Sequence, residues 1–447
     1  MKIVISGANG IGIHLAKLML SDNEDVVLID EDTEKLLYLT SDFDMMTINA
    51  SPTSVQTLKD AGIGRTDLFV AVNADENVNI TSSVLAHELG AKKIVARIDN
   101  PEYMRPEMVE HFKHIGIDYL VYPEYLAGVE IANSLHTSWA RMRWDVYNGE
   151  LVLLGVKLRE TCEILNQSLK DISGPNDPFH IVAIKRNGET LIPSGIDELK
   201  LYDIAYFMTT KNQIPYIRKL VGKAQYEDVK NVIIVGGGKT AVNAARAMQK
   251  HFSVKLIEAD EKRCEQLNEL LEDENILIIN GDGRDLNLLK NEGIQFTQAF
   301  VSLTENSETN ILACLTAKRL GVRKTVAMVE NLDYVNMAES LDIGTIINKR
   351  TITAGHIYQR TLKSAVENVR FMMTADAEVA EFVVAADAKI TKTEVKNLKL
   401  PSDMNIGGLI RDGKAYLVSG NTQIQAGDRV VVFSQETMIK KLAKYFT

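Results

Sequence analysis

The sequence predicts an α/β fold with two doubly wound parallel-sheet domains, each followed by a small α+β domain. Three observations support this prediction. The chain opens on an apolar, β-branched run at residues 2–6 that leads into a glycine-rich turn. The same pattern begins again at Asn231, and each half ends in short alternating strands separated by turn residues. A strand, a glycine turn and a helix in this order are typical of the start of a βαβ unit.

Short apolar runs alternate with amphipathic stretches along the first half of the chain. One helical stretch carries Ile80, Val84, Leu85 and Leu89 on a single face. Strands that alternate with helices form parallel βαβ units, so we expect one doubly wound sheet here. Right-handed crossovers place the glycine turn at the carboxyl edge of that sheet, where ligands bind. The predicted strands lie near residues 2–6, 26–30, 45–49, 68–72, 93–97 and 118–122.

Segments of the first half recur in the same order in the second half. VVLIDED at 26–32 corresponds to VKLIEAD at 254–260, and IVARIDNPEY at 94–103 corresponds to TVAMVENLDY at 325–334. The glycine turns also correspond, as do the segments DLFVAVNADENVN and TQAFVSLTENSETN. The offset between the copies stays between 228 and 231 residues. An internal duplication accounts for this regular spacing, so the two halves should share one fold.

Each parallel-sheet unit is followed by a helical connector and a hairpin-rich module. Residues 180–195 are typical of a hairpin around Arg186-Asn187-Gly188, and residues 406–433 turn at Asp412-Gly413. An aspartate-glycine turn between alternating runs is a strong hairpin signal. The predicted parts are parallel-sheet domains at 1–122 and 230–349, connector helices at 123–143 and 350–372, and small α+β domains at 144–220 and 373–447.

The composition is that of an ordinary globular protein, with 45% apolar and 25% charged residues. No run of 18 apolar residues occurs, so we expect no transmembrane helix, and the opening MKIVISG resembles a strand rather than a secretory signal. The net charge of -10 argues against a general nucleic-acid surface. Cys162, Cys264 and Cys314 lack metal-ligand spacing and suggest a reducing cytoplasm.

The two glycine turns match the dinucleotide fingerprint G-x-G-x-x-G/A to different degrees. In the second turn, Gly236, Gly238 and Ala241 fit without a gap. In the first, Gly7 and Gly12 occupy the outer positions, whereas the middle position holds asparagine. A helix that begins at such a turn directs its free N–H groups and its positive dipole end at a phosphate. We therefore expect two Rossmann-like nucleotide-binding domains.

An acidic residue ends the second strand of each unit. Asp30 lies 18 residues beyond Gly12, and Glu258 takes the same place in the second copy. A carboxylate there accepts hydrogen bonds from ribose hydroxyls and repels a 2′-phosphate. The sites should therefore prefer NAD(H) or adenosine phosphates over NADP(H). Asp32 is more simply explained as the N-cap of the next helix.

The chain resembles the Trk potassium-uptake regulator family (TrkA), which is built from two tandem RCK (KTN) modules. The resemblance covers nearly the whole sequence and rests on the paired glycine turns and acids, the DEN-x-N and E-x-T-N segments, and the two small C-terminal modules. It implies RCK N-lobes and C-lobes and no catalytic activity. It also implies a cytoplasmic homo-oligomeric ring, dimeric or tetrameric, on the inner face of the membrane. That ring would bind NAD(H) and ATP/ADP and gate a potassium-translocating membrane subunit of the TrkH/KtrB type.

Further site residues follow from the resemblance. The loop after the fourth strand passes over the nucleotide, a basic residue after the fifth strand approaches phosphate, and Gly-Asp follows the third strand. Arg97 is replaced by Met328 in the second copy, and Gly281-Asp282 is replaced by Ala50-Ser51 in the first, so we expect the two sites to differ in ligand. The complete set of expected cofactor-binding residues is Gly7, Ala8, Asn9, Gly10, Ile11, Gly12, Asp30, Asn73, Ala74, Asp75, Arg97, Gly236, Gly237, Gly238, Lys239, Thr240, Ala241, Glu258, Asp282, Thr304 and Glu305.

The alternative is an NAD-dependent oxidoreductase of unknown substrate. Such an enzyme needs a proton donor beside the nicotinamide, and no nucleophile–base or carboxylate pair stands out in the sequence. GGGKT lacks the first glycine of a P-loop, since Ile233 stands there within a strand. His111 and His114 fit a solvated helix face better than a metal site. We therefore predict no catalytic residues and no metal ligands.

Overall fold

The computed structural model describes residues 1–43, 45–172, 174, 178–272, 274–361, 366–372, 377–401, 403–435 and 439–447. The chain divides into two compact units. The first contains Met1–Leu126 and the segment Lys349–Lys363, which includes helix α14 (Lys349–Gln359), and the second contains Ala127–Asn348 and Ser364–Thr447. Each unit is described by itself below.

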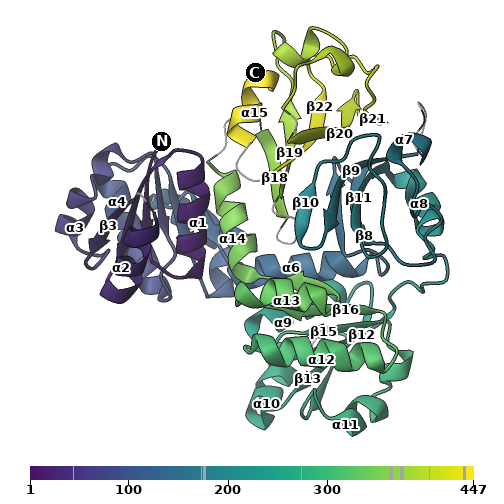
Figure 1. Cartoon of the computed structure of the whole chain (residues 1–447). Coiled ribbons are helices and arrows are strands. Elements are labelled where there is room, and N and C mark those ends of the chain that lie inside the picture. The colour runs from purple at the N-terminus through teal and green to yellow at the C-terminus, as the bar shows by residue number, and fades with distance from the viewer. Residues whose placement is uncertain are drawn as a thin grey trace. The chain divides into compact units, whose positions relative to one another are not determined.

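The first unit is built on a parallel six-stranded sheet in the order β3-β2-β1-β4-β5-β6 (Figure 1). This is the strand order of a doubly wound dinucleotide-binding fold. The strands are β1 (Lys2–Ser6), β2 (Asp25–Asp30), β3 (Met46–Asn49), β4 (Leu68–Ala71), β5 (Ile94–Arg97) and β6 (Tyr119–Val121). The helices between them are α1 (Gly10–Ser21), α2 (Thr33–Asp42), α3 (Val55–Asp60), α4 (Glu76–Glu88) and α5 (Pro106–His114). Ile3, Val4 and Ile5 are fully buried, which explains why β1 is a continuous apolar run.

The second unit contains a parallel sheet with the same topology, in the order β14-β13-β12-β15-β16-β17. Its strands are β12 (Asn231–Val235), β13 (Ser253–Glu258), β14 (Ile276–Asn280), β15 (Ala299–Ser302), β16 (Lys324–Met328) and β17 (Thr345–Ile347). Its helices are α9 (Lys239–Met248), α10 (Glu261–Leu270), α11 (Leu286–Asn291), α12 (Ser307–Arg319) and α13 (Asp333–Ser340). The predicted duplication of the Rossmann-like fold is confirmed.

The second unit also holds two antiparallel sheets, as the predicted small α+β domains require. The first has the order β10-β9-β11-β8-β7 and the second has the order β18-β19-β22-β20-β21. The first comprises β7 (Met142–Val146), β8 (Leu151–Lys157), β9 (Phe179–Arg186), β10 (Glu189–Leu191), β11 (Ile204–Thr210), α7 (Leu169–Ile172) and α8 (Ile214–Leu220). The second comprises β18 (Val366–Met372), β19 (Ala377–Val383), β20 (Met404–Arg411), β21 (Lys414–Leu417), β22 (Arg429–Gln435) and α15 (Ile439–Phe446).

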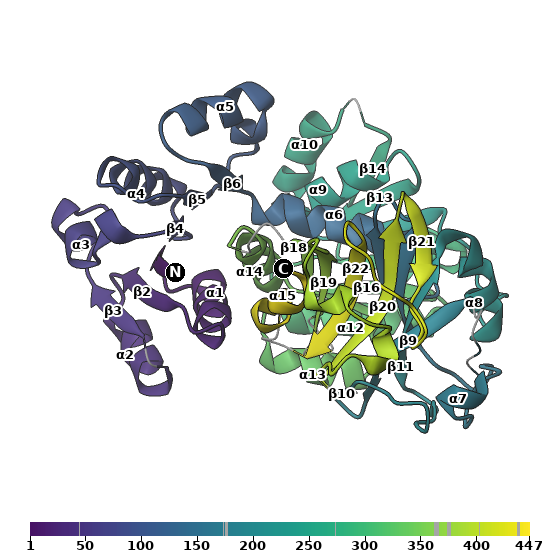
Figure 2. The ribbon, with the colours of Figure 1, turned by 90° about the horizontal axis from the view of Figure 1, so that it is seen from above.

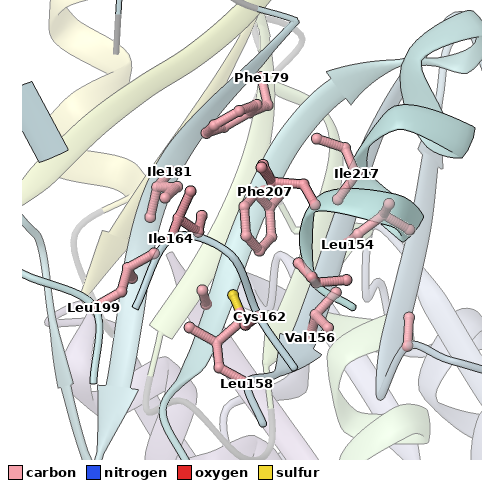
Figure 3. Packing of buried hydrophobic residues seen from close by; sticks show 14 of the residues in the cluster. Leu154, Val156, Leu158, Cys162, Ile164, Phe179, Ile181, Leu199, Phe207 and Ile217 are labelled. Carbon is pink, nitrogen blue, oxygen red and sulfur yellow. The ribbon is translucent and has the colours of Figure 1, made fainter. Parts of the chain in front are cut away.

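The two antiparallel sheets share one hydrophobic core. One face of the first sheet packs under α8, where Leu154, Phe179, Phe207 and Ile217 are buried (Figure 3). The opposite face contributes Tyr206 to a cluster with residues of β19, β20 and β22, and its ring centroid lies 5.8 Å from that of Phe433. Figure 2 shows β20 and β22 beside β9 and β11. The two small domains are therefore packed sheet against sheet.

A buried ion pair repeats in the two small domains. Arg186 donates Nε and Nη2 to the two oxygens of Asp203 at 2.9 and 2.7 Å. Arg411 makes the same two bonds to Asp428 at 2.8 and 2.6 Å. Both aspartates are only 1% exposed. Paired two-point contacts of this kind fix the hairpin ends, and their recurrence marks the two domains as copies.

The two connector helices are shorter than the sequence suggests. Helix α6 (Pro123–Leu135) ends well before residue 143, because β7 begins at Met142. Helix α14 ends at Gln359, and residues 366–372 form strand β18 rather than continuing the helix. The expectation of helical connectors through 143 and 372 is therefore wrong at their carboxyl ends. Pairing of β18 with β19 supplies the backbone hydrogen bonds that override the helical prediction.

Each connector helix packs on the Rossmann-like domain of the other repeat. In the first unit, α14 lies along α1 (Figures 1 and 2). In the second unit, a Cβ on Gly128 of α6 would lie 2.7 Å from Ala244 N of α9, so the two helices approach backbone to backbone. Ile131 and Leu135 of α6 are buried within the chain itself.

Candidate nucleotide-binding sites

The first glycine turn joins β1 to α1 and packs against the loop that follows β4. Gly7 has a φ of +112°, and a Cβ on Gly7 would lie 2.8 Å from Asn73 N. A Cβ on Gly12 would lie 1.9 Å from Gly7 O. A side chain is excluded at both positions, because Gly7 has a left-handed backbone and neither position has space. These two glycines therefore form the tight turn that the fingerprint predicts.

Asn9, at the middle position of the fingerprint, is the N-cap of helix α1. Its Oδ1 accepts hydrogen bonds from Ile11 N at 3.0 Å and Gly12 N at 3.2 Å, and its Nδ2 donates to Val72 O. Asparagine is a favoured N-cap because its oxygen satisfies N–H groups that have no partner within the helix. A phosphate at a helix N-terminus uses the same groups. The first turn is thus intact, but its helix end is already capped by the protein.

The acid at the end of the second strand is bonded to the glycine turn in both copies. Asp30 accepts hydrogen bonds from Ala8 N at 2.5 Å and from Asp32 N at 2.8 Å, one on each oxygen. Glu258 accepts from Gly237 N at 2.6 Å and makes the matching 2.9 Å bond two residues further on. A carboxylate has about four lone-pair positions. Each oxygen therefore retains capacity for a ribose hydroxyl.

The second glycine turn leaves its helix end open. Gly236 has a φ of +98°, and a Cβ there would lie 2.9 Å from Leu303 O, so the turn has the tight geometry of the first. Gly238 is the N-cap of α9 and makes no side-chain hydrogen bond to the helix. A Cβ on Gly238 would meet no described atom within 4 Å. Thr240 and Ala241 complete the buried side of the first helical turn.

Two basic residues flank the second turn. Lys239 is the first residue of α9 and is exposed. Arg263, on α10, donates its Nε to Gly237 O at 2.9 Å. Lys239 belongs to the glycine motif in the sequence, whereas Arg263 lies on the helix after the next strand, so no local signal connects Arg263 with the turn. An open helix end beside two cations is favourable for an anion.

A buried asparagine fixes the loop after the fourth strand in each copy. Asn79 accepts from Asn73 N at 2.7 Å and donates to the backbone oxygens of Asn73 and Arg97. Asn310 makes the equivalent bonds to Thr304 and to the end of β16. Both asparagines are the last residues of the repeated segments at 67–79 and 297–310, and no role was expected for them from the sequence. Their occurrence at equivalent positions in the two repeats indicates that both have the same structural role.

The remaining loop residues that the resemblance suggested lie at the same edge of each sheet. Asp75 is the N-cap of α4 and accepts a hydrogen bond from Asn77 N at 2.8 Å. Asn306 has the same role in the second copy. Ala74 and Glu305 are exposed in these loops. Contact with a nucleotide remains a prediction for all of them.

Arg97 and Asp282, the residues that distinguish the two copies, each have an intrachain partner. Arg97 Nη2 lies 3.0 Å from Asp99 Oδ1, and the arginine side chain is 17% exposed. Arg284 Nη2 lies 2.7 Å from Asp282 Oδ2, and hydrogen bonds from Arg284 hold the pKa of Asp282 below its usual value. A phosphate would have to compete with Asp99 for this end of the guanidinium group. The buried Arg97 Nε makes no hydrogen bond within the described residues, so part of the group is not used by Asp99.

Arg350 is the basic residue that lies at the first turn. It is the second residue of α14, and it is exposed. A Cβ on Gly10 would lie 2.3 Å from Arg350 Cδ, so glycine is what admits the arginine to this position. This contact was not expected from the sequence, because it joins residues of the two repeats. One signal was present, since Lys239 is the residue that corresponds to Gly10 in the second copy.

Other chemistry-bearing residues do not assemble into sites in the described part of the chain. Within residues 1–43, 45–172 and the later described ranges, no group of three or more His, Cys, Asp and Glu side chains could hold a metal ion. Cys162, Cys264 and Cys314 are buried and form no disulfide. His111 and His114 are exposed on α5, as the sequence suggested. None of the described helices combines the length and apolar character needed to cross a bilayer.

Two Rossmann-like domains with acid-anchored glycine turns, each followed in sequence by a small antiparallel domain, define a tandem repeat of one α/β fold. Solved structures of this fold include the GsuK RCK domain, with a TM-score of 0.61 and 16% identity over 100% of this chain and 94% of that one. A structure described as the GsuK channel bound to NAD covers 100% of this chain and 78% of that one, with a TM-score of 0.60 and 16% identity. These similarities show the fold.

Sequence comparison then shows the family. The TrkA-N domain model matches residues 3–123 and 232–349, and the TrkA-C domain model matches residues 379–447. A Trk system potassium uptake protein TrkA homolog from Archaeoglobus fulgidus is 30% identical over 450 residues, covering 100% of both chains. The TrkA protein of Haemophilus influenzae is 29% identical over 456 residues, covering 100% of this chain and 98% of its own. The chain belongs to the TrkA family, whose modules are regulatory rather than catalytic.

Proposed function

We propose that this chain is the nucleotide-sensing regulatory subunit of a potassium uptake system. NAD(H) and ATP/ADP bind at the two Rossmann-like domains, and the resulting conformational change passes to a potassium-translocating membrane subunit of the TrkH/KtrB type. The chain acts on the cytoplasmic face of the membrane as a ring-forming homo-oligomer. Relatives named as potassium uptake proteins support this assignment, as do GsuK structures described as bound to NAD and to ADP.

The observation that carries the proposal is the matched geometry of the acid and the glycine turn in both copies. The carboxylates of Asp30 and Glu258 are held 2.5 and 2.6 Å from a backbone N–H of their own turns. A carboxylate fixed at this place accepts hydrogen bonds from the ribose hydroxyls of a bound nucleotide. It also repels a 2′-phosphate, so both sites favour NAD(H) and adenosine phosphates over NADP(H).

The two sites offer a phosphate different surroundings. In the first, Asn9 caps the helix, and the guanidinium group of Arg350 lies against Gly10. In the second, the N-cap is Gly238 and the cations are Lys239 and Arg263. Backbone N–H groups left open at a helix N-terminus bind phosphate directly. The second site should therefore bind phosphate more through its backbone, and the first more through a side chain.

Ion pairs connect the second Rossmann-like domain to the first small domain. Asp342, in the loop before β17, contacts Arg141, Lys157 and Arg159. Lys185 of β9 pairs in the same way with Glu339 of α13. A movement of the Rossmann-like domain is therefore carried to the antiparallel sheets. Nucleotides shift such an arrangement only if they bind its two states with different affinity.

The proposal is tested by comparing NADH with NADPH. At equal concentrations, NADH should raise the melting temperature of the protein more than NADPH does, because the Asp30 carboxylate repels the 2′-phosphate. Asp30→Asn removes this charge, so the melting-temperature increases caused by NADH and by NADPH should become more similar. Equal shifts for NADH and NADPH in the wild-type protein would contradict the assignment. Steady oxidation of NADH with hydroxy- or keto-acids would instead favour the alternative of an NAD-dependent oxidoreductase.

A further inference from the structure

Arg350 and the first glycine turn meet although they belong to different repeats. Helix α14 packs against α1 within the first compact unit, and Gly10 is the first residue of α1. A Cβ on Gly10 would lie 2.7 Å from Arg350 Nε and 2.8 Å from Arg350 Nη1. The guanidinium group therefore lies directly over the N-terminal end of α1. Arg350 is exposed, so solvent and small ligands have access to it.

We propose that Arg350 binds a phosphate of the nucleotide in the first site and thereby ties occupancy of that site to the second repeat. This inference rests on the proposed nucleotide-binding function. A guanidinium group presents donors in a fixed planar fork that matches phosphate oxygens. The guanidinium group of Arg350 also lies at the N-terminus of α1, which is where a phosphate binds to a helix.

The repeat itself shows that a cation is placed at this position twice. Lys239 corresponds to Gly10, so the second site carries the positive charge on its own helix. In the first site the same position is glycine, and the charge comes instead from Arg350 of the other repeat. The two sites therefore differ in where their charge originates. Only the first depends on the placement of a connector helix.

In the first site, fewer groups of the first repeat are left to bind a phosphate, so a cation from the second repeat would strengthen binding. The N–H groups of Ile11 and Gly12 are already bonded to Asn9 Oδ1, which leaves less of the helix end for a phosphate. Arg97 is paired with Asp99. A side chain that supplies both charge and donors offsets the loss of these N–H groups at the helix end. Arg350 is the arginine that the structure places against the turn.

Helix α14 is held on the first domain by contacts remote from the turn. Tyr358 Oη donates to Asp22 Oδ2 at 2.5 Å, and Arg360 lies over the ring of Tyr119 at 4.7 Å. Such contacts keep the helix in place without a ligand. A phosphate that bridges the turn and Arg350 adds a charge-assisted bond and stabilises the docked helix further. Because strand β18 of the second small domain follows α14 in sequence, this bond links the first nucleotide to that domain.

The test compares Arg350→Ala with Lys239→Ala in the full-length protein. Binding of ADP and of adenosine is measured by calorimetry, and hydrogen exchange is measured in peptides covering residues 349–359. Arg350→Ala should weaken ADP binding at one site about tenfold, leave adenosine binding unchanged, and abolish the ADP-induced protection of α14. Lys239→Ala should weaken ADP at the other site and leave the protection of α14 intact. Arg350→Lys keeps the charge but loses the planar guanidinium group. Its ADP affinity should lie between that of the wild-type protein and that of Arg350→Ala.

Several outcomes would overturn the inference. Unchanged ADP affinity at both sites in Arg350→Ala would show that the arginine does not touch the ligand. An equal loss for ADP and adenosine would show that it only supports the packing of α14. In both cases ADP still binds the wild-type protein, so the proposed function survives. Failure of the wild-type protein to bind ADP or NADH would instead remove the proposed function, and this inference with it.

Discussion

Asp342 is the residue whose substitution should most disturb the connection between the first small domain and the second Rossmann-like domain. Its carboxylate contacts four cations: Arg141, Lys157 at 3.3 Å, Arg159 and Lys318 at 3.0 Å. Burial acts to raise the pKa of Asp342, but the charges of Arg141, Lys318 and Lys157 outweigh it and hold the pKa well below its usual value. The aspartate therefore stays charged at neutral pH.

Asp342→Asn removes this charge with little change of shape. The backbone at this position has a φ of +58°, which asparagine tolerates as aspartate does. Loss of one partner of a buried ion pair costs about 3–5 kcal/mol. The Asp342 side chain is 24% exposed, which lowers the cost, whereas four cations rather than one lose their partner. We expect the free energy of unfolding of this region to fall by about 3 kcal/mol.

Urea denaturation at neutral pH measures this loss, because urea does not screen charges. Trp139 and Trp144 lie on either side of Arg141 in the sequence, so intrinsic fluorescence reports on the affected region. Glu110→Gln is the matched control, because Glu110 is 61% exposed and pairs with Lys113 on the surface. That substitution should change the free energy of unfolding by less than about 0.5 kcal/mol.

The pH dependence provides a second check. Because the folded pKa of Asp342 is lowered, its contribution is present above the unfolded pKa of about 3.9 and is lost as the pH falls through the folded pKa. The difference in the free energy of unfolding between the wild-type protein and Asp342→Asn should therefore become smaller in strong acid. Added sulfate should partly restore the variant by neutralising the four cations. If Asp342→Asn behaves like Glu110→Gln at neutral pH, the reasoning about this cluster is wrong.

Two further predictions concern buried charges. Asp428→Asn should lower the free energy of unfolding by about 2 kcal/mol, because its 1% exposed carboxylate accepts two charge-assisted bonds from Arg411. Urea denaturation checks this, with Glu110→Gln again as control. Burial, with Arg141 adding to it, lowers the pKa of Lys324 to about 7. The folded protein therefore binds fewer protons than the unfolded chain between about pH 7 and 10. Wild-type stability should rise with pH across that window relative to Lys324→Met, and parallel curves would contradict the prediction.

The fold could be predicted because its determinants are local and repeated. Strands buried on both faces of a parallel sheet are continuous β-branched runs, so β1 and β12 are evident in the sequence. The position of Asp30 and Glu258 follows from the strand order, since both end the strand next to the glycine turn. Duplication doubled each signal. The sequence was therefore sufficient for the sheets and for the place of the acid beside each glycine turn.

The features that the sequence did not reveal arise from contacts between distant segments. Nothing near Arg350 indicates that it lies over Gly10, because the contact depends on how α14 packs. The length of the second connector was misjudged because residues 366–372 become a strand only by pairing with β19. One local feature of the sequence does point to this contact. The first repeat has Gly10 at the position where the second repeat has Lys239. Tertiary packing decides such cases, and propensity does not.

Counting NADH-binding sites by calorimetry tests the central claim most directly. The account predicts two NADH-binding events of different affinity per chain in the wild-type protein, one of them lost in Asp30→Ala and the other in Glu258→Ala. Because the acids are at equivalent places in the two repeats, each substitution should leave its counterpart site intact. Absence of NADH binding, or two unchanged events in both variants, would contradict it.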